Sequence, residues 1–179
     1  MLGWYHQRDV ELASLIRDVP DFPKPGIVFK DITTLLKVPA ALKQVIDELT
    51  DIFRDERIEL VVGMESRGFI FAAPLAYNLG AGLIPVRKLG KLPHHTLSIE
   101  YALEYGTNTL EIHRDSIEPG QRVLIVDDLL ATGGTVAATV ELVQQLKGEV
   151  VAAAFLVELA ELEGRKALSD VKVVSLIQG

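Results

Sequence analysis

The sequence contains no cysteine, and this absence excludes several kinds of chemistry within the chain. Disulfide bonds, thiolate-bound metal sites and thiol nucleophiles all require cysteine. Histidine is also scarce, and the spacing of the four histidines does not resemble the HExxH pattern of zinc sites. They are His6, His94, His95 and His113. A metal bound through oxygen atoms, such as magnesium, is compatible with this composition.

Long apolar runs are missing as well. The longest one, Val150–Val157, is much shorter than the roughly 20 residues that a membrane-spanning helix needs. Near the start, His6, Arg8 and Asp9 interrupt any apolar stretch of the kind found in secretion signals. The sequence therefore predicts no membrane segment and a cytoplasmic location.

Positive charge is in deficit, because 18 Lys and Arg residues face 25 Asp and Glu residues and give a formal net charge of −7. We expect no nucleic-acid partner, since nucleic acid binds to broad basic surfaces. A compact basic patch for a small anion is compatible with this charge. The length of 179 residues, 49% of them hydrophobic, is enough for a full core and fits a single domain over residues 1–179.

Apolar residues follow helical and strand-like patterns in alternation. Steps of three and four residues, as in Leu42, Val45, Ile46 and Leu49, predict a helix over 41–55. Further helices are expected at 69–79 and 136–148, and strands at 59–63, 82–86, 123–126 and 150–157. Strands without polar alternation, separated by helices, are typical of a parallel sheet covered on both faces. We therefore predict an α/β fold with a mostly parallel sheet flanked by helices.

Two segments do not fit this alternation. Residues 21–29 contain Pro23, Pro25 and Gly26, which exclude an ordinary helix, and residues 88–108 are polar, punctuated by glycine and weakly periodic. Because binding and catalytic residues are common in loops, both segments are candidate functional loops.

The segment Val123–Thr135, with the sequence VLIVDDLLATGGT, is the clearest candidate binding site. Ligands of open α/β sheets bind beyond the carboxyl ends of the strands, and Asp127 and Asp128 follow the expected strand directly. Two adjacent carboxylates need a ligand that donates hydrogen bonds, such as a vicinal diol or magnesium-bound water. Ribose 5-phosphate fits this requirement.

The second part of the segment, Ala131–Thr135, has the features of a phosphate site. Gly133 and Gly134 let the backbone approach a ligand closely, and Thr132 and Thr135 supply hydroxyl donors. The helix that follows offers free N–H groups and the positive end of its dipole. A nucleoside triphosphate loop would carry a lysine in the pattern GxxxxGK[ST]. Its absence here favours a single terminal phosphate.

This segment resembles the phosphoribosyl pyrophosphate (PRPP) motif of the type I phosphoribosyltransferases. Other stretches resemble the adenine phosphoribosyltransferases of that family, in the same order along the chain. They are Asp21–Asp31 (DFPKPGIVFKD), Val62–Phe71 (VGMESRGFIF), Val86–Pro93 (VRKLGKLP), Leu103–Gly106 (LEYG) and Leu156–Leu159 (LVEL). The PRPP motif alone identifies the superfamily, whereas the combination of motifs is specific to the adenine enzymes.

The resemblance implies the reversible, magnesium-dependent reaction of adenine with PRPP to give AMP and pyrophosphate, a step of purine salvage. It further implies a homodimer, an N-terminal hood over residues 1–35 and a flexible catalytic loop over residues 88–108. Magnesium would be held mainly by PRPP and water, with Asp127 and Asp128 as the nearby protein carboxylates.

PRPP is strongly anionic, so an acidic chain needs concentrated positive groups to bind it. The matching motifs supply them, and the resemblance implies that Arg87 acts across the dimer interface. In the matching pyrophosphate loop, Glu65–Gly68, an unusual peptide geometry is expected to turn backbone N–H groups toward the leaving group. The expected PRPP-binding residues are Glu65, Ser66, Arg67, Arg87, Lys88, Lys91, Asp127, Asp128, Ala131, Thr132, Gly133, Gly134 and Thr135.

Exchange at C1 of ribose passes through an oxocarbenium-like state, so a carboxylate is needed to stabilise positive charge or to manage a proton on the base. Residue chemistry alone does not distinguish Glu100 from Glu104. The LEYG match selects Glu104, beside Tyr105, as the residue that loop closure brings in. Arg67 is the second catalytic candidate, and the role of Glu104 as acid, base or electrostatic group stays open.

For the base, Phe29 offers an aromatic face, and the extended backbone around Val28 can read a 6-amino purine through N–H and C=O groups. Lys30 stands where we would most expect arginine, and Leu159 is expected to cover the other face of the base. The expected adenine-binding residues are Val28, Phe29, Lys30 and Leu159. Two alternatives stay open: transfer to guanine, hypoxanthine, xanthine or orotate, and a PRPP-sensing regulator without catalysis.

Overall fold

The structure is a computed structural model that describes residues 10–103 and 106–179. The chain divides into two compact units, one ending at Glu48 and the other beginning at Leu49. None of the helices within the described ranges is both long and apolar enough to cross a bilayer.

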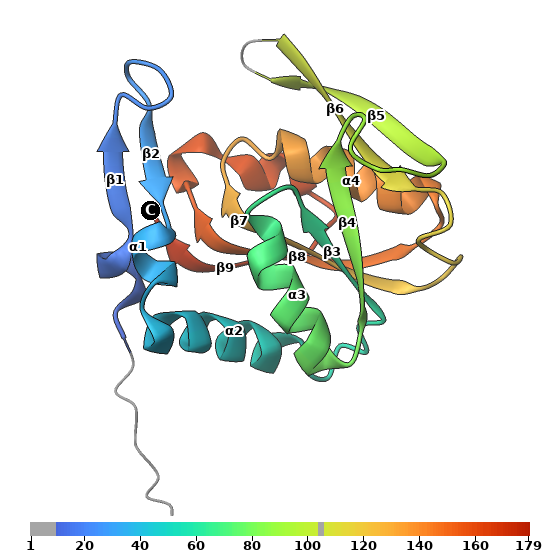
Figure 1. The fold of residues 1–179 in the computed structure, drawn as a ribbon, viewed down its shortest axis with the longest axis horizontal. Helices are drawn as coiled ribbons and strands as arrows, with labels where there is room; N and C mark the ends of the chain where they lie inside the picture. Colours follow the sequence, from blue (N-terminus) through green and yellow to red (C-terminus); the bar gives the residue numbers. More distant parts are fainter. Residues whose placement is uncertain (1–9, 104–105) are drawn as a thin grey trace, which may run out of the picture. The chain divides into compact units, whose positions relative to one another are not determined.

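The first unit contains a small antiparallel sheet and short helices (Figure 1). The 3-10 helix η1 (Leu12–Leu15) precedes strand β1 (Arg17–Pro20), which pairs with β2 (Val28–Asp31). Helix α1 (Thr33–Leu36) follows, and α2 (Pro39–Phe53) runs on into the second unit. The proline-rich connection between β1 and β2 is not helical, as the sequence predicts.

The second unit is built on a seven-stranded sheet with the order β5-β6-β4-β3-β7-β8-β9. Its parallel strands are β3 (Leu60–Met64), β4 (Gly82–Lys88), β7 (Arg122–Leu130), β8 (Glu149–Glu158) and β9 (Val173–Gln178). The edge strands β5 (Thr96–Leu103) and β6 (Gly106–His113) run antiparallel to their neighbours. This arrangement confirms the predicted α/β fold with a mostly parallel sheet.

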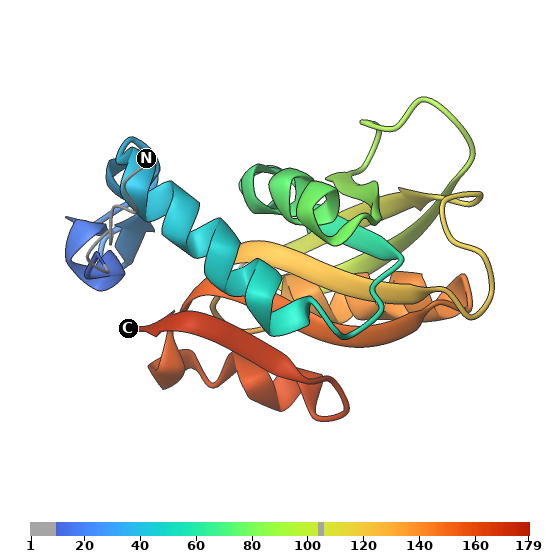
Figure 2. The ribbon, with the colours of Figure 1, turned by 90° about the horizontal axis from the view of Figure 1, so that it is seen from below.

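Helices cover both faces of this sheet, as predicted. Helix α3 (Gly68–Leu79) and helix α4 (Gly134–Gln145) lie on opposite faces (Figure 2). The α4 side holds a buried cluster in which Val62 and Ile125 from the strands pack with Val140. The short 3-10 helices η2 (Ala160–Leu162) and η3 (Gly164–Leu168) connect β8 to β9.

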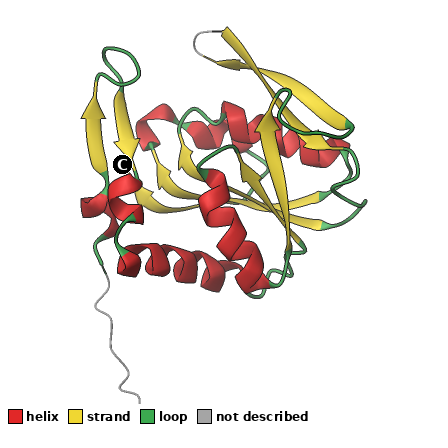
Figure 3. Cartoon of the chain, viewed as in Figure 1, coloured by secondary structure: helices red, strands yellow, loops and turns green. Residues whose placement is uncertain are grey.

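The hairpin of β5 and β6 is the largest feature that the sequence patterns did not predict (Figure 3). All of β5 falls in the polar stretch 88–108, yet Leu97, Ile99 and Tyr101 alternate with polar residues and pack on the core of the second unit. That period of two is the usual signature of a half-buried strand. The signal was present, but the surrounding polar and glycine residues obscured it.

Candidate active site

Asp127 and Asp128 lie inside β7, not after it. The sequence predicted that the strand ends at Val126, but pairing with β8 continues to Leu130. The apolar pattern breaks at the aspartates, whereas the backbone hydrogen bonds of the ladder do not. The extension fixes the positions of both carboxylates, because each belongs to a residue of a paired central strand.

The two carboxylates form an unfavourable pair that favours a ligand able to donate hydrogen bonds. Burial and the negative charge of Asp128 raise the pKa of Asp127 well above its ordinary value. Burial also raises the pKa of Asp128, although the nearby charge of Arg67 opposes the shift. Arg67 Nε lies 2.8 Å from Asp128 Oδ2 as an ion pair. This buried oxygen nevertheless accepts no hydrogen bond of regular geometry from the described residues.

These pKa shifts predict a pH-dependent cost in stability. A carboxyl group whose pKa is raised by folding stabilises the folded state below its unfolded pKa of about 4, and this contribution is lost as pH rises through the folded pKa. Asp127→Asn, which stays neutral, should therefore raise the free energy of unfolding at pH 7, with little effect near pH 4. Urea denaturation at both pH values measures the difference. An Asp127→Asn variant less stable than the parent at pH 7 would contradict this electrostatic picture.

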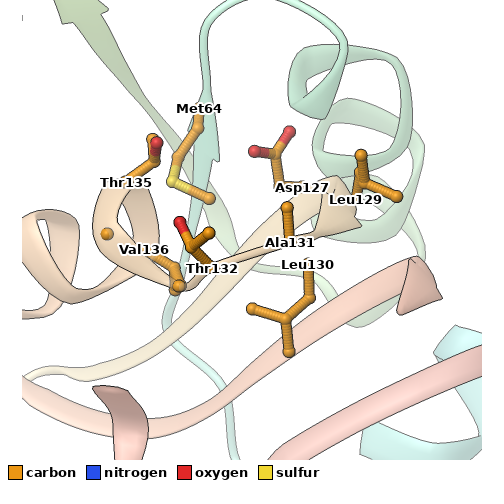
Figure 4. Close-up of a pocket in the computed structure, with 10 residues that line it drawn as sticks. Met64, Asp127, Leu129, Leu130, Ala131, Thr132, Thr135 and Val136 are labelled. Carbon is orange, nitrogen blue, oxygen red and sulfur yellow. The ribbon is translucent and has the colours of Figure 1, made fainter. Parts of the chain in front are cut away.

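The loop after β7 and the start of α4 form a small pocket of about 80 Å³. Its lining residues are Met64, Asp127, Leu129, Leu130, Ala131, Thr132, Gly133, Gly134, Thr135 and Val136. Figure 4 shows the Asp127 carboxylate, the Met64 sulfur and the hydroxyls of Thr132 and Thr135 around this hollow. The N-cap residue of α4 is Gly133, which makes no side-chain cap hydrogen bond. The N–H groups at the start of α4 are therefore suited to an anion, and the phosphate site stays a prediction.

Gly133 must be glycine for two reasons. Its φ of 86° lies in the left-handed region, and an added Cβ would lie 2.4 Å from the carbonyl oxygen of Gly164. The 3-10 helix η3, which begins at Gly164, thus packs directly against the loop at Ala131–Thr135. The sequence patterns revealed the glycine at 133 but not the close partner.

Gly133→Ala is expected to destabilise the fold and weaken phosphate binding. Gly120→Ala is the matched control, because Gly120 has a φ of 84° but open space around it. The control should show only the left-handed strain, about 1–2 kcal/mol. Crowding against Gly164 should make Gly133→Ala about 1–3 kcal/mol worse than the control. Equal losses in thermal or urea unfolding would contradict the proposed close packing.

The pyrophosphate loop predicted at Glu65–Gly68 follows β3. The peptide bond Glu65–Ser66 is cis, and α3 begins at Gly68. A Cβ added to Gly68 would lie 2.8 Å from the carbonyl oxygen of Val126 and 2.9 Å from Asp127 Oδ1. Because Gly68 has no side chain, the start of α3 approaches β7 closely at Val126 and Asp127. Arg67 and Asp128 meet as a result.

The carboxylate of Glu65 faces Arg87 and Lys88 at the end of β4. Arg87 Nε and Nη2 each lie 3.3 Å from a Glu65 oxygen, and the Lys88 N–H donates to Glu65 Oε2 at 3.0 Å. The Lys88 hydrogen bond, followed by Arg87, holds the pKa of Glu65 below its ordinary value despite partial burial. The side chain of Glu65 therefore orients Arg87, which sequence reasoning did not predict.

The buried carboxylate of Glu111 holds the residues that follow β4. Oε1 of Glu111 in β6 accepts the N–H groups of Lys91 and Leu92, both at 2.9 Å, and Arg87 donates to the Lys91 carbonyl at 3.2 Å. Burial by itself would raise the pKa of Glu111, but these amide hydrogen bonds outweigh it and lower the pKa. The structure thus anchors Arg87 and Lys88 at the end of β4 and Lys91 in the loop that follows this strand. Sequence reasoning missed Glu111 because its antiparallel partner strand was not predicted.

The expected base-binding residues occupy both units. Phe29 in β2 is half-buried, and its ring meets the Phe22 ring edge-on at 5.2 Å between centroids. Lys30 pairs with Asp18 at 2.9 Å. Leu159 follows β8 in the second unit and is buried. Glu104, the expected catalytic carboxylate, and Tyr105 lie outside the described residues.

Comparison with known proteins finds relatives along nearly the whole chain. A family model of the phosphoribosyl transferase domain matches residues 31–179. The adenine phosphoribosyltransferase of Chloroflexus aurantiacus is 60% identical over 168 residues, which cover 94% of this chain and 97% of that protein. The crystal structure of the Thermoanaerobacter pseudethanolicus enzyme of that name has a TM-score of 0.92 at 53% identity, covering 94% and 98% of the two chains. The Saccharomyces cerevisiae enzyme, crystallised with adenine and an imino-altritol bisphosphate, gives 0.85 at 41% identity, with 91% and 94% covered.

Proposed function

The chain belongs to the adenine phosphoribosyltransferase family of the phosphoribosyltransferases, and on that premise we propose that its residues transfer the 5-phosphoribosyl group of PRPP to adenine with the help of magnesium. The products are AMP and pyrophosphate, as in purine salvage. The observation that carries this proposal is the joint position of Asp127, Asp128 and the pocket at Ala131–Thr135, at the end of one central strand.

We propose that this strand end binds the sugar and its phosphate. The 5-phosphate accepts hydrogen bonds from the loop, from the first turn of α4 and from the hydroxyls of Thr132 and Thr135. The ribose hydroxyls donate to Asp127 and Asp128, which relieves their mutual repulsion through hydrogen bonds. The acceptor-only, ionised form of the pair binds the diol best, so binding should release protons.

The opposite side of the ribose faces the groups that hold pyrophosphate in our proposal. Backbone N–H groups of Glu65–Gly68 and the side chain of Arg67 bind the leaving group, and the loop with Arg87, Lys88 and Lys91 adds positive charge. Arg67 touches Asp128 as well, so a single guanidinium links the ribose hydroxyl side to the pyrophosphate side. Glu104 approaches C1 when the loop closes and stabilises the positive charge that develops there.

Magnesium fits this site as a partner of the ligand. The described residues contain no group of three or more acidic or histidine side chains that could hold a metal ion by themselves. Asp127 and Asp128 are adjacent carboxylates with raised pKa values, and they can bind magnesium directly or through water. When bound, magnesium would neutralise pyrophosphate charge as the bond to C1 breaks.

For the base, we propose recognition by the backbone of β2 together with stacking on Phe29. Within the described residues the small sheet has two strands, so β2 forms one of its edges. Backbone N–H and C=O groups along this edge can match the donor and acceptor pattern of a 6-amino purine and oppose that of a 6-oxo purine. Lys30, whose ammonium pairs with Asp18, is a further proposed contact of the base. Leu159 remains the proposed apolar cover for the base.

We also propose a homodimer that uses an exposed apolar surface of α3 and β4. Ile70 and Tyr77 lie two helical turns apart on α3 and are 40% and 87% exposed, and Leu83 in β4 is 44% exposed. Arg87 lies four residues after Leu83 and therefore on the same face of the strand. A second copy covering this surface would bring Arg87 to the interface.

The cytoplasmic location stays a prediction.

Leu83→Glu is expected to convert the dimer into a monomer and to raise the KM for PRPP. A buried charge at the interface opposes association, and separation removes the partner's contribution near Arg87. Sedimentation at several concentrations measures the mass, with Leu162→Glu as a control at another exposed leucine. A parent protein that sediments as a monomer at all concentrations would contradict the dimer.

The base preference is tested by offering adenine, guanine, hypoxanthine, xanthine and orotate separately with PRPP and magnesium, and by measuring nucleotide and pyrophosphate. We expect turnover with adenine at least 100-fold above the others, because a misplaced polar group leaves buried partners unpaired. Preference for another base would favour the second candidate, a phosphoribosyltransferase of different specificity. Binding of PRPP without turnover of any base would favour the regulator.

A further inference from the structure

Tyr101 connects the β5–β6 hairpin to the phosphate pocket. Its hydroxyl lies 3.3 Å from Thr135 Oγ1, a hydrogen-bonding distance, and both residues are partly buried. Thr135 lines the pocket at the start of α4, and the ring of Tyr101 packs against the core of the second unit. A tyrosine ring held by packing places its hydroxyl with little loss of conformational freedom. The contact therefore joins the hairpin to a proposed phosphate donor.

The chemistry of two hydroxyls defines what this contact can do. Each hydroxyl donates one hydrogen bond and accepts up to two. In the structure Thr135 Oγ1 donates to the Tyr101 hydroxyl oxygen. When the two hydroxyls rotate so that the Tyr101 O–H donates to Thr135 Oγ1, the hydrogen of Thr135 becomes available for a phosphate oxygen. The final bond to the anion is charge-assisted and is strengthened by the bond that precedes it. The Thr139 hydroxyl donates to the Thr135 carbonyl at 2.9 Å, so this carbonyl already has a hydrogen-bond partner.

We propose that Tyr101 is a positioning residue for the 5-phosphate, which acts through Thr135 and makes the hairpin sense an occupied phosphate pocket. This inference rests on the proposed binding of the 5-phosphate at Ala131–Thr135. Tyr101 lies in β5, which ends at Leu103. Occupation of the pocket by a phosphate therefore stabilises the position of this strand. The relay links binding of one end of PRPP to the hairpin.

The test is a double-mutant cycle with Tyr101→Phe, Thr135→Val and the combined variant. Calorimetry measures the Kd of ribose 5-phosphate, and steady-state rates give the KM for PRPP and kcat. We expect Tyr101→Phe to raise Kd about fivefold, the effect of one neutral hydrogen bond. Thr135→Val should raise it about 30-fold, and adding Tyr101→Phe to Thr135→Val should change it no further.

The outcomes separate the relay from the phosphate site itself. If Tyr101→Phe weakens binding equally with Thr135 present or replaced, Tyr101 does not act through Thr135 and the inference is wrong. If Thr135→Val leaves the Kd of ribose 5-phosphate unchanged, the phosphate placement fails and the relay fails with it. A role of Tyr101 in packing alone predicts a lower melting temperature with an unchanged Kd. The relay instead predicts an unchanged melting temperature and a raised Kd.

Discussion

Asp128→Ala is expected to weaken PRPP binding about 100-fold while the chain stays folded. A hydrogen bond to a charged acceptor contributes about 1.5–3 kcal/mol, and each 1.4 kcal/mol corresponds to a factor of ten in affinity. The variant removes a buried carboxylate whose pKa is raised by burial, so the fold loses an unfavourable charge. Arg67 is partly exposed and can be rehydrated when its partner is removed. Calorimetry with PRPP and magnesium measures the affinity.

Asp170→Ala provides the control for the change in net charge, because Asp170 is exposed. The control should bind PRPP like the parent. An Asp128→Ala variant that keeps its PRPP affinity and loses turnover would show that Asp128 acts in catalysis and not in sugar binding, against the roles proposed here.

Glu104→Ala is expected to lower kcat by a factor of at least about 100, with a small change in PRPP affinity. Positioned carboxylates in proton transfer or charge stabilisation contribute about 100-fold to 10,000-fold to rates. Because Glu104 enters the site on loop closure in our proposal, its removal affects the transition state more than ground-state binding. Single-turnover rates and equilibrium binding separate the two effects.

The matched control is Glu100→Ala in β5, where the glutamate is exposed. Residue chemistry alone did not distinguish these two glutamates, so this pair of variants tests the assignment made from the LEYG resemblance. A larger loss of kcat in Glu100→Ala than in Glu104→Ala would reverse that assignment.

The layered fold and the phosphate loop were predictable because they depend on local patterns. Buried parallel strands are continuous apolar runs, and amphipathic helices repeat every three to four residues. At Gly133 the requirement for a left-handed residue is likewise local, and the sequence predicted both the turn and the helix behind it. The patterns failed at the boundary of β7, where pairing with β3 ends at Val126 but pairing with β8 carries the strand on through two charged residues.

The remaining features depend on contacts between residues far apart in the sequence. Glu111 accepts a hydrogen bond from Lys91, 20 residues earlier, and Gly164 packs against Gly133 although α4, β8 and η2 separate them in the sequence. Tyr101 reaches Thr135 from an edge hairpin that looked like a polar loop. No local period indicates which distant backbone will be the partner. Tertiary packing therefore supplies the anchors of the site, while the sequence motifs supply the groups that touch the ligand.

The central claim is that the strand end at Asp127 and the loop at Ala131–Thr135 hold ribose and its 5-phosphate. A crystal structure of the chain with AMP tests this claim most directly. We predict that the phosphate accepts hydrogen bonds from the backbone of residues 131–135 and that the ribose hydroxyls donate to Asp127 and Asp128. A phosphate bound at the basic loop of Arg87 and Lys91, with the carboxylates away from the ribose, would contradict the account.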